Sequence, residues 1–207
     1  MYVDDILIFG PQTSSGFVTE TKHLIQDSFE CKDLGTTRFI LGLEIQITQQ
    51  GIEISQTGYI NKILDRFGFT NCRPVATPLD PNAQFRVDET STEIDSNEYQ
   101  SIIGSLMYAA IGTRPDLAYT TTFLSQYNST PSTKHLQAAK RALRYLRGTT
   151  EWSLFYPRGS TDIPPISCYT DASCASDLDT RRSFSGYLVR LNDFSFLLRS
   201  LSSRRDM

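Results

Sequence analysis

The chain is poor in the residues that hold small domains together covalently or through metals. It has four cysteines and two histidines among 207 residues. No two cysteines form a Cys-x-x-Cys pair, and no histidine lies near any of them in sequence. We therefore expect neither a zinc site nor a disulfide framework, but reduced thiols in an intracellular protein.

The chain also lacks a long hydrophobic run. No apolar stretch approaches the roughly 20 residues needed to cross a bilayer. Met1 is followed at once by charge, which argues against a signal peptide. Hydrophobic residues make up 39% and charged residues 21%, which is enough to bury a core. We expect a globular protein with no membrane partner, located in the cytoplasm or the nucleus and not secreted.

Positive charge is scarce overall but is concentrated in one stretch. The net charge is −3, which argues weakly against a nucleic-acid partner. Residues 80–98 carry six acidic residues and one arginine, whereas residues 132–158 carry six lysines or arginines and one glutamate. Because the charges are segregated, the basic stretch can bind phosphates even in a mildly acidic chain.

The first third of the chain predicts strands and short helices. Residues 2–9 are expected to form a strand interrupted by two aspartates, and residues 16–29 a helix. Residues 38–56 alternate apolar and polar side chains around Gln49-Gln50-Gly51, which is typical of a β-hairpin. A helix over about 57–68 ends at Gly68. The expected core positions of the first helix are Phe17, Leu24, Ile25 and Phe29.

The rest of the chain predicts a linker, three helices and further strands. Residues 71–96 are rich in Pro, Asp, Thr and Asn, which favours a linker. A helix over 97–110 follows. Thr113 is expected to cap the next helix, with Pro115 in its first turn. Ser132 or Thr133 caps a third helix that runs to Gly148. The segments WSLFY, ISCYTDAS and FSGYLVRL then read as strands.

The third of these helices is amphipathic. Its apolar face carries Leu136, Ala139, Leu143 and Leu146. Another face carries Lys140, Arg144 and Arg147 at i, i+4 and i+7, which forms a basic stripe. We expect these three residues to contact nucleic-acid phosphates without regard to base sequence.

The adjacent aspartates Asp4 and Asp5 precede the apolar run Ile6–Phe9. Two carboxylates at the bend of a hairpin can reach one point in space, and such oxygens are the ligands that Mg²⁺ prefers. Two metals about 3.5–4 Å apart can activate an attacking hydroxyl and stabilise a leaving pyrophosphate. On its own, an Asp-Asp pair in a turn is more commonly solvated turn chemistry.

A long ordered series of motifs supports the catalytic alternative. The series runs YVDD, KDLG, LGLEI, ISQ-x-x-YI-x-KIL, TPLD, YQSIIGSLMYA, TRPDLAY, LSQY, PS-x-x-H, AAKRALRYLRGT, YTDAS and RRSFSGYL. It closely resembles the polyprotein of copia-type LTR retrotransposons over roughly residues 2–191. The resemblance implies the end of a reverse transcriptase, a connecting region and the start of ribonuclease H.

This resemblance implies roles for particular residues. Asp4 and Asp5 match the metal-binding carboxylates of the polymerase, and Tyr2 and Val3 match positions beside the nucleotide and the primer end. Asp171, in YTDAS, matches the first Mg²⁺-binding carboxylate of ribonuclease H. The implied cofactor is Mg²⁺ in a two-metal site. The implied partners are an RNA or DNA template–primer and deoxynucleoside triphosphates, and the intact family protein works in virus-like particles.

The sequence departs from the family pattern at both ends. The polymerase needs a further aspartate on a strand upstream of YVDD, and no such strand precedes Met1. After SGYLVRLNDF the family continues with a tryptophan-containing strand and a glutamate-bearing helix, whereas this chain reads SFLLRSLSSRRDM. We therefore expect a fragment with two incomplete sites, inactive by itself and exposing apolar edges.

The expected fold class is α+β. We expect a palm end and thumb region over 1–70, a linker over 71–96, a helical connection over 97–150 and a truncated ribonuclease H-like domain with an aberrant tail over 151–207. Three functional alternatives follow. The chain is part of an RNA-directed DNA polymerase, a non-catalytic remnant that binds nucleic acid through its basic helix, or the product of an open reading frame that never accumulates.

Overall fold

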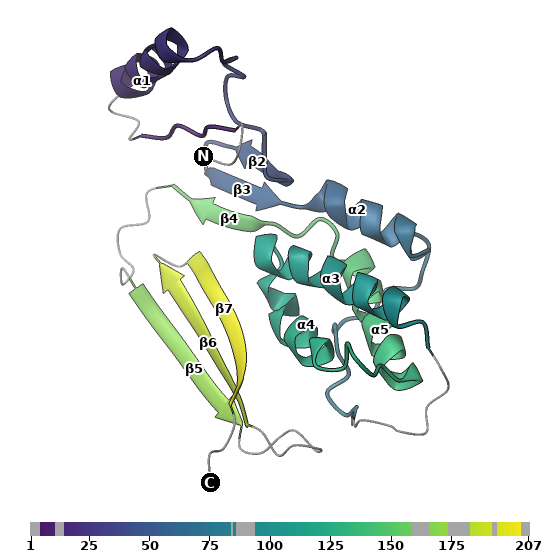
Figure 1. Cartoon of the computed structure of the whole chain (residues 1–207). Coiled ribbons are helices and arrows are strands. Elements are labelled where there is room, and N and C mark those ends of the chain that lie inside the picture. Colours follow the sequence, from purple (N-terminus) through teal and green to yellow (C-terminus); the bar gives the residue numbers. More distant parts are fainter. Residues whose placement is uncertain are drawn as a thin grey trace.

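The computed structural model describes residues 5–10, 15–83, 85, 94–158, 166–173, 183–191 and 194–203 (Figure 1). It is a mixture of helices and antiparallel strands, which confirms the expected α+β class. The helices are α1 (Ser15–Ser28), α2 (Thr57–Arg66), α3 (Ser96–Gly112), the short 3₁₀ helix η1 (Pro115–Leu117), α4 (Ala118–Ser125) and α5 (Thr133–Gly148). No helix in these ranges is long and apolar enough to cross a membrane.

The strands form two separate sheets. The first has the order β1-β2-β3-β4 and contains β1 (Phe39–Ile40), β2 (Leu43–Ile47), β3 (Gly51–Ser55) and β4 (Leu154–Pro157). The second has the order β5-β6-β7 and contains β5 (Ile166–Ser173), β6 (Ser183–Leu191) and β7 (Phe194–Ser203). The strand β7 was not predicted, because the tail was interpreted as aberrant.

The predicted hairpin is confirmed. Strands β2 and β3 pair antiparallel, with Ile47 opposite Ile52 and Ile45 opposite Ile54. Because paired residues point to the same face of a sheet, these isoleucines form one apolar face. Strand β4 then pairs with β3, placing Tyr156 opposite Ile52. The strand predicted from WSLFY therefore forms at Leu154–Pro157 and belongs to the first sheet.

The hydrophobic core lies among α2, α3, α4 and α5. Amphipathic spacing in each helix directs a stripe of aliphatic side chains inward. The most deeply buried leucines and isoleucines of this core, each at most 1% exposed, are Ile60, Leu64, Ile102, Ile103, Leu106, Leu117, Leu124, Leu143 and Leu146. The core thus joins α2 to helices that follow residue 95.

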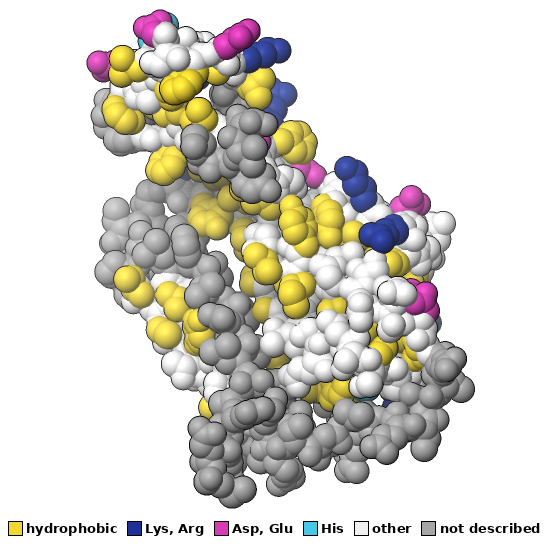
Figure 2. Space-filling view, in the orientation of Figure 1, with side chains coloured by type: hydrophobic (Ala, Val, Ile, Leu, Met, Phe, Trp, Pro, Cys, Tyr) yellow, Lys and Arg dark blue, Asp and Glu magenta, His cyan; other side chains and the backbone are white. Residues whose placement is uncertain are grey.

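The N-terminal end of the described chain differs from the prediction. Asp5 makes an isolated bridge, and residues 6–10 form no regular strand, because a strand is stabilised by the partners that pair with its backbone. Helix α1 forms as predicted, but Phe17, Leu24 and Phe29 are 54%, 63% and 69% exposed. Their assignment to the core was wrong. Helix α1 stands apart from the helical core (Figure 1), and hydrophobic side chains gather on the surface at that end (Figure 2).

The cap of the helix after α3 also differs from the prediction. Thr113 does not cap it, because its buried hydroxyl donates a hydrogen bond to Oε1 of Gln56 at 3.0 Å. Arg114 precedes η1 instead, and Pro115 lies in the first turn as expected. The cap of α5 is confirmed at Ser132. The backbone N–H of Ser132 donates to Nδ1 of His135 at 2.9 Å, which closes a capping box.

A buried ionic network joins η1 to the end of α5. The guanidinium of Arg114, only 1% exposed, donates two hydrogen bonds to Asp116, at 3.0 and 2.7 Å. It also donates to the carbonyl and hydroxyl oxygens of Thr149, at 2.9 and 2.6 Å. The rings of Tyr145 and Trp152 lie 5.4 Å from its central carbon. Together these contacts compensate the guanidinium for the hydration that it loses in the core.

Tyr145 makes this network sensitive to alkaline pH. Burial, aided by the hydrogen bond that its hydroxyl donates to Asp116 at 2.7 Å, raises the pKa of Tyr145 to about 12. The neutral phenol is therefore favoured by folding, and this stability is complete below pH 10 and is lost as pH rises from about 10 to 12.

We expect Tyr145→Phe to flatten this alkaline loss. Across pH 10 to 12, wild-type protein should lose about 2 kcal/mol more unfolding free energy than the variant. Urea unfolding at several pH values measures the difference. Both proteins retain Tyr99, so its titration cancels in the comparison. Parallel stability profiles for the two proteins would contradict the prediction.

Candidate polymerase, ribonuclease H and phosphate-binding residues

The polymerase residues predicted at the start of the chain are only partly within the structure. Tyr2, Val3 and Asp4 lie outside the described residues. Asp5 is described, and its side chain is exposed to solvent beside the first residues of the apolar run. An exposed carboxylate can supply oxygen to a hard cation such as Mg²⁺, so the chemistry of Asp5 fits its predicted role.

Asp171 lies near the carboxyl end of β5. Its residue partner on β6 is Gly186, and its side chain is exposed. Because glycine has no side chain, the residue directly opposite Asp171 leaves the space beside its carboxylate open. One carboxylate oxygen, Oδ1, accepts a hydrogen bond from the backbone N–H of Ala172 at 2.9 Å.

The two described carboxylates come from different parts of the fold. Asp5 precedes α1, whereas Asp171 belongs to the second sheet. Among the residues that the structure describes, no three His, Cys, Asp or Glu side chains gather into a potential metal site. Asp5 and Asp171 thus each offer one carboxylate group to a metal ion, at separate places in the fold.

The basic stripe of α5 is present, but its three members differ in their surroundings. The ammonium group of Lys140 lies 3.0 Å from Oε1 of Glu98 on α3. Arg144 and Arg147 instead donate from Nε to backbone carbonyls of the segment after α2: Arg144 to Arg73 at 2.9 Å, and Arg147 to Thr70 at 2.6 Å. Lys140 therefore has an acidic partner, whereas the two arginines have neutral ones.

Sequence reasoning missed two further cations at this surface. A terminal nitrogen of Arg141 donates to the hydroxyl of Thr77 at 2.9 Å. Arg73 follows α2 and lies beside α5, because its carbonyl accepts the bond from Arg144. The i, i+3, i+6 spacing of Arg141, Arg144 and Arg147 was a signal in the sequence. The sequence assigns residues 70–77 mostly to a linker. It gives no sign that this segment packs against α5.

Comparison with known proteins places the chain in a family. The family described as "Reverse transcriptase (RNA-dependent DNA polymerase)" matches residues 1–81. The chain is 40% identical over 196 residues to the retrovirus-related Pol polyprotein from transposon TNT 1-94 of Nicotiana tabacum, a match that covers 91% of this chain and 14% of that protein. It is 37% identical over 191 residues to the corresponding polyprotein from transposon RE1 of Arabidopsis thaliana, covering 92% and 13%.

A shorter relative matches along most of its own length. The chain is 33% identical over 192 residues to an uncharacterised mitochondrial protein of Arabidopsis thaliana, AtMg00810, covering 92% of this chain and 77% of that protein. No solved structure matches the chain. The chain belongs to the reverse transcriptase family of retrotransposon Pol polyproteins, of the copia type, which confirms the resemblance seen in its motifs. It spans only 14% of the length of the TNT 1-94 polyprotein.

Proposed function

We propose that this chain supplies part of an RNA-directed DNA polymerase that uses Mg²⁺. The observation that carries the proposal is the family match over residues 1–81, which includes the YVDD motif. In this role Asp4 and Asp5 are metal-binding carboxylates, and Tyr2 and Val3 lie beside the incoming nucleotide and the primer end. The proposed partners are an RNA or DNA template–primer and deoxynucleoside triphosphates, handled inside the cell.

The proposed contribution of these residues is to position charge. Bound Mg²⁺ would favour ionisation of the primer 3′-hydroxyl and stabilise the pyrophosphate that leaves. Asp4 and Asp5 would hold the cation through oxygen atoms, and a third carboxylate is expected from another strand of the polymerase. Because two carboxylates bind such an ion weakly, we expect these 207 residues to need a second polypeptide segment for activity.

Asp171 is the proposed first carboxylate of a ribonuclease H site. Two observations support this role: its place near the end of β5, and the glycine opposite it, which leaves room on that face. The carboxylates that would complete such a site are not assigned to any residue of this chain. Ribonuclease H activity is therefore also expected to require further residues.

Primer extension tests the polymerase proposal. The full chain is incubated with a DNA primer annealed to an RNA template, the four triphosphates and Mg²⁺. The assay is run alone and with a fragment of the TNT 1-94 polyprotein that carries the residues upstream of its own YVDD motif. We expect extension only in the mixture, reduced by at least about 100-fold by Asp5→Asn, because the metals then lose a charged ligand.

The matched control is Asp65→Asn, which removes an exposed carboxylate from α2. This control should extend the primer at the rate of the wild-type mixture. Equal extension by the Asp5→Asn mixture would show that Asp5 is not a metal ligand. A mixture with no extension at all would overturn the polymerase proposal.

Binding of nucleic acid without catalysis is the second candidate function. Arg144 and Arg147 of α5 favour it, because their guanidinium groups donate to neutral carbonyl oxygens. The two candidates differ in their dependence on Mg²⁺. Phosphate contacts by arginine persist in a metal chelator, whereas primer extension stops.

A further inference from the structure

Three arginines of α5 hold one extended segment against the helix. Arg141, Arg144 and Arg147 are spaced three residues apart, so each is a surface neighbour of the next, about 4.5 Å further along the axis. Their acceptors, Thr77, the Arg73 carbonyl and the Thr70 carbonyl, follow one another in reverse order along the chain. The segment of residues 70–77 therefore runs antiparallel to α5.

These contacts orient the guanidinium groups without neutralising them. Arg144 and Arg147 each use Nε, and their acceptors are uncharged carbonyls. Within the described part of the chain, their terminal amino groups make no hydrogen bond. A guanidinium fixed through Nε keeps its two terminal nitrogens as a planar fork, which is the geometry that binds a phosphate through two hydrogen bonds.

The charge of this surface is positive. Neither α5 nor residues 70–77 contains an aspartate or glutamate. Arg73 adds a fourth guanidinium, and its side chain is exposed. Lys140 is different, because Glu98 lies 3.0 Å from its ammonium group. The four arginines Arg73, Arg141, Arg144 and Arg147 therefore carry the further inference, and Lys140 is left out of it because of its acidic partner.

We propose that this set, the arginine track of Arg73, Arg141, Arg144 and Arg147, binds the phosphate backbone of a nucleic-acid duplex. A duplex carries one negative charge per about 1.7 Å of its axis. Arg141 and Arg147 lie roughly 9 Å apart along the axis of α5, so the arginines between these two positions can contact several phosphates at once. The inference rests on the proposed function, since a polymerase of this family acts on a primer–template duplex.

Fluorescence anisotropy of the full chain tests the track. The probe is a fluorescein-labelled DNA duplex of mixed sequence, about 20 base pairs long, titrated between about 50 and 200 mM salt. We expect Arg73→Ala and Arg147→Ala each to weaken binding about three- to tenfold at the lowest salt. Each should also lower the salt-dependence slope by about 0.9, the contribution of one phosphate contact.

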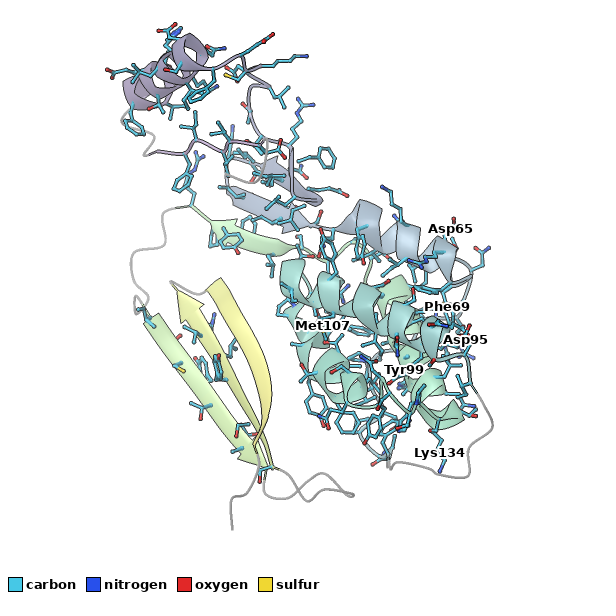
Figure 3. All side chains as sticks on the ribbon, in the orientation of Figure 1. Asp65, Phe69, Asp95, Tyr99, Met107 and Lys134 are labelled. Atoms are coloured by element: carbon cyan, nitrogen blue, oxygen red, sulfur yellow. The ribbon has the colours of Figure 1, made fainter. Side chains whose placement is uncertain are left out.

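Two features of the design separate phosphate binding from folding and from net charge. The Arg73 side chain has no hydrogen bond in the described structure, so Arg73→Ala should melt at the wild-type temperature. Lys134→Ala is the matched control, since it removes an exposed cation from the first turn of the same helix, at the lower end of the helical core (Figure 3). It should change binding less than twofold.

The outcomes that overturn the track are specific. Equal weakening by Lys134→Ala and Arg73→Ala would show a response to net charge alone. Binding of the duplex by both arginine variants with the affinity of the wild-type chain would also overturn the proposal. So would a wild-type chain that does not bind the duplex. In each case the polymerase proposal is judged separately, by primer extension in the mixture.

Discussion

Replacing Asp116 by alanine is expected to lower the free energy of unfolding by about 4 kcal/mol, more than replacing Arg114, its ion-pair partner, by methionine. The two side chains are buried to different extents, 1% exposed for Arg114 and 29% for Asp116. Removing the carboxylate leaves a guanidinium in the core whose remaining hydrogen-bond acceptor, among the residues that the structure describes, is Thr149. An uncompensated buried charge of this kind typically costs about 3–5 kcal/mol.

Replacing Arg114, the other partner of the ion pair, destabilises the protein less. In Arg114→Met, the charge that remains is on Asp116, which keeps water and the hydroxyl of Tyr145 as partners. Methionine also fills much of the volume between the rings of Tyr145 and Trp152. We therefore expect a loss of about 2 kcal/mol for this variant.

Urea unfolding of the two variants measures this order. Asp65→Ala on the exposed face of α2 serves as a control and should change stability by less than about 0.5 kcal/mol (Figure 3). A larger loss for Arg114→Met than for Asp116→Ala would show that packing around the arginine, and not the unpaired charge, dominates the network.

The parts of the fold that the sequence predicts well are local. The hairpin around Gln49-Gln50-Gly51 and helices α2, α3 and α5 follow from periodicity and capping over a few residues. The errors concern contacts between distant residues. The packing of Phe17 and Leu24 on α1 depends on whether another surface covers them, and periodicity says only that the helix has an apolar side.

The same distinction applies to the candidate sites. The strand that carries Asp171 could be predicted from the residues around it, and β5 forms there. The ion pair of Lys140 with Glu98 could not, because these residues lie 42 positions apart in the chain on different helices. The bonds from Arg144 and Arg147 to the chain after α2 span 71 and 77 residues. No local pattern specifies contacts of that separation.

Two glycines of α3 are expected to respond to alanine in opposite directions. Gly104 lies in the helix with no atom within 4 Å of an added Cβ, so Gly104→Ala should stabilise the protein by about 0.5–1 kcal/mol through helix propensity. An added Cβ on Gly112 would lie 2.6 Å from Cδ of Gln56, much closer than carbon atoms approach. Gly112→Ala should therefore destabilise the protein by about 3 kcal/mol.

The side chain of Gln56 cannot easily move away from this added methyl group. It is fully buried, and its Oε1 accepts a hydrogen bond from the hydroxyl of Thr113. Its Nε2 has no hydrogen-bond partner among the described residues. The hydrogen bonding of Gln56 therefore offsets only part of the free-energy cost of burying its amide group. Shortening Gln56 to alanine should make room for the methyl group, but it also removes the acceptor of the buried Thr113 hydroxyl, which costs about 1–3 kcal/mol.

A double-mutant cycle in urea tests this account. We expect Gly112→Ala with Gln56→Ala to be more stable than the sum of the two single changes by about 1–2 kcal/mol, because the clash requires both side chains. Additive losses would place the cost of Gly112→Ala in the backbone of α3 instead. Gly104→Ala, in the same helix and without a clash, separates that cost from the general effect of alanine.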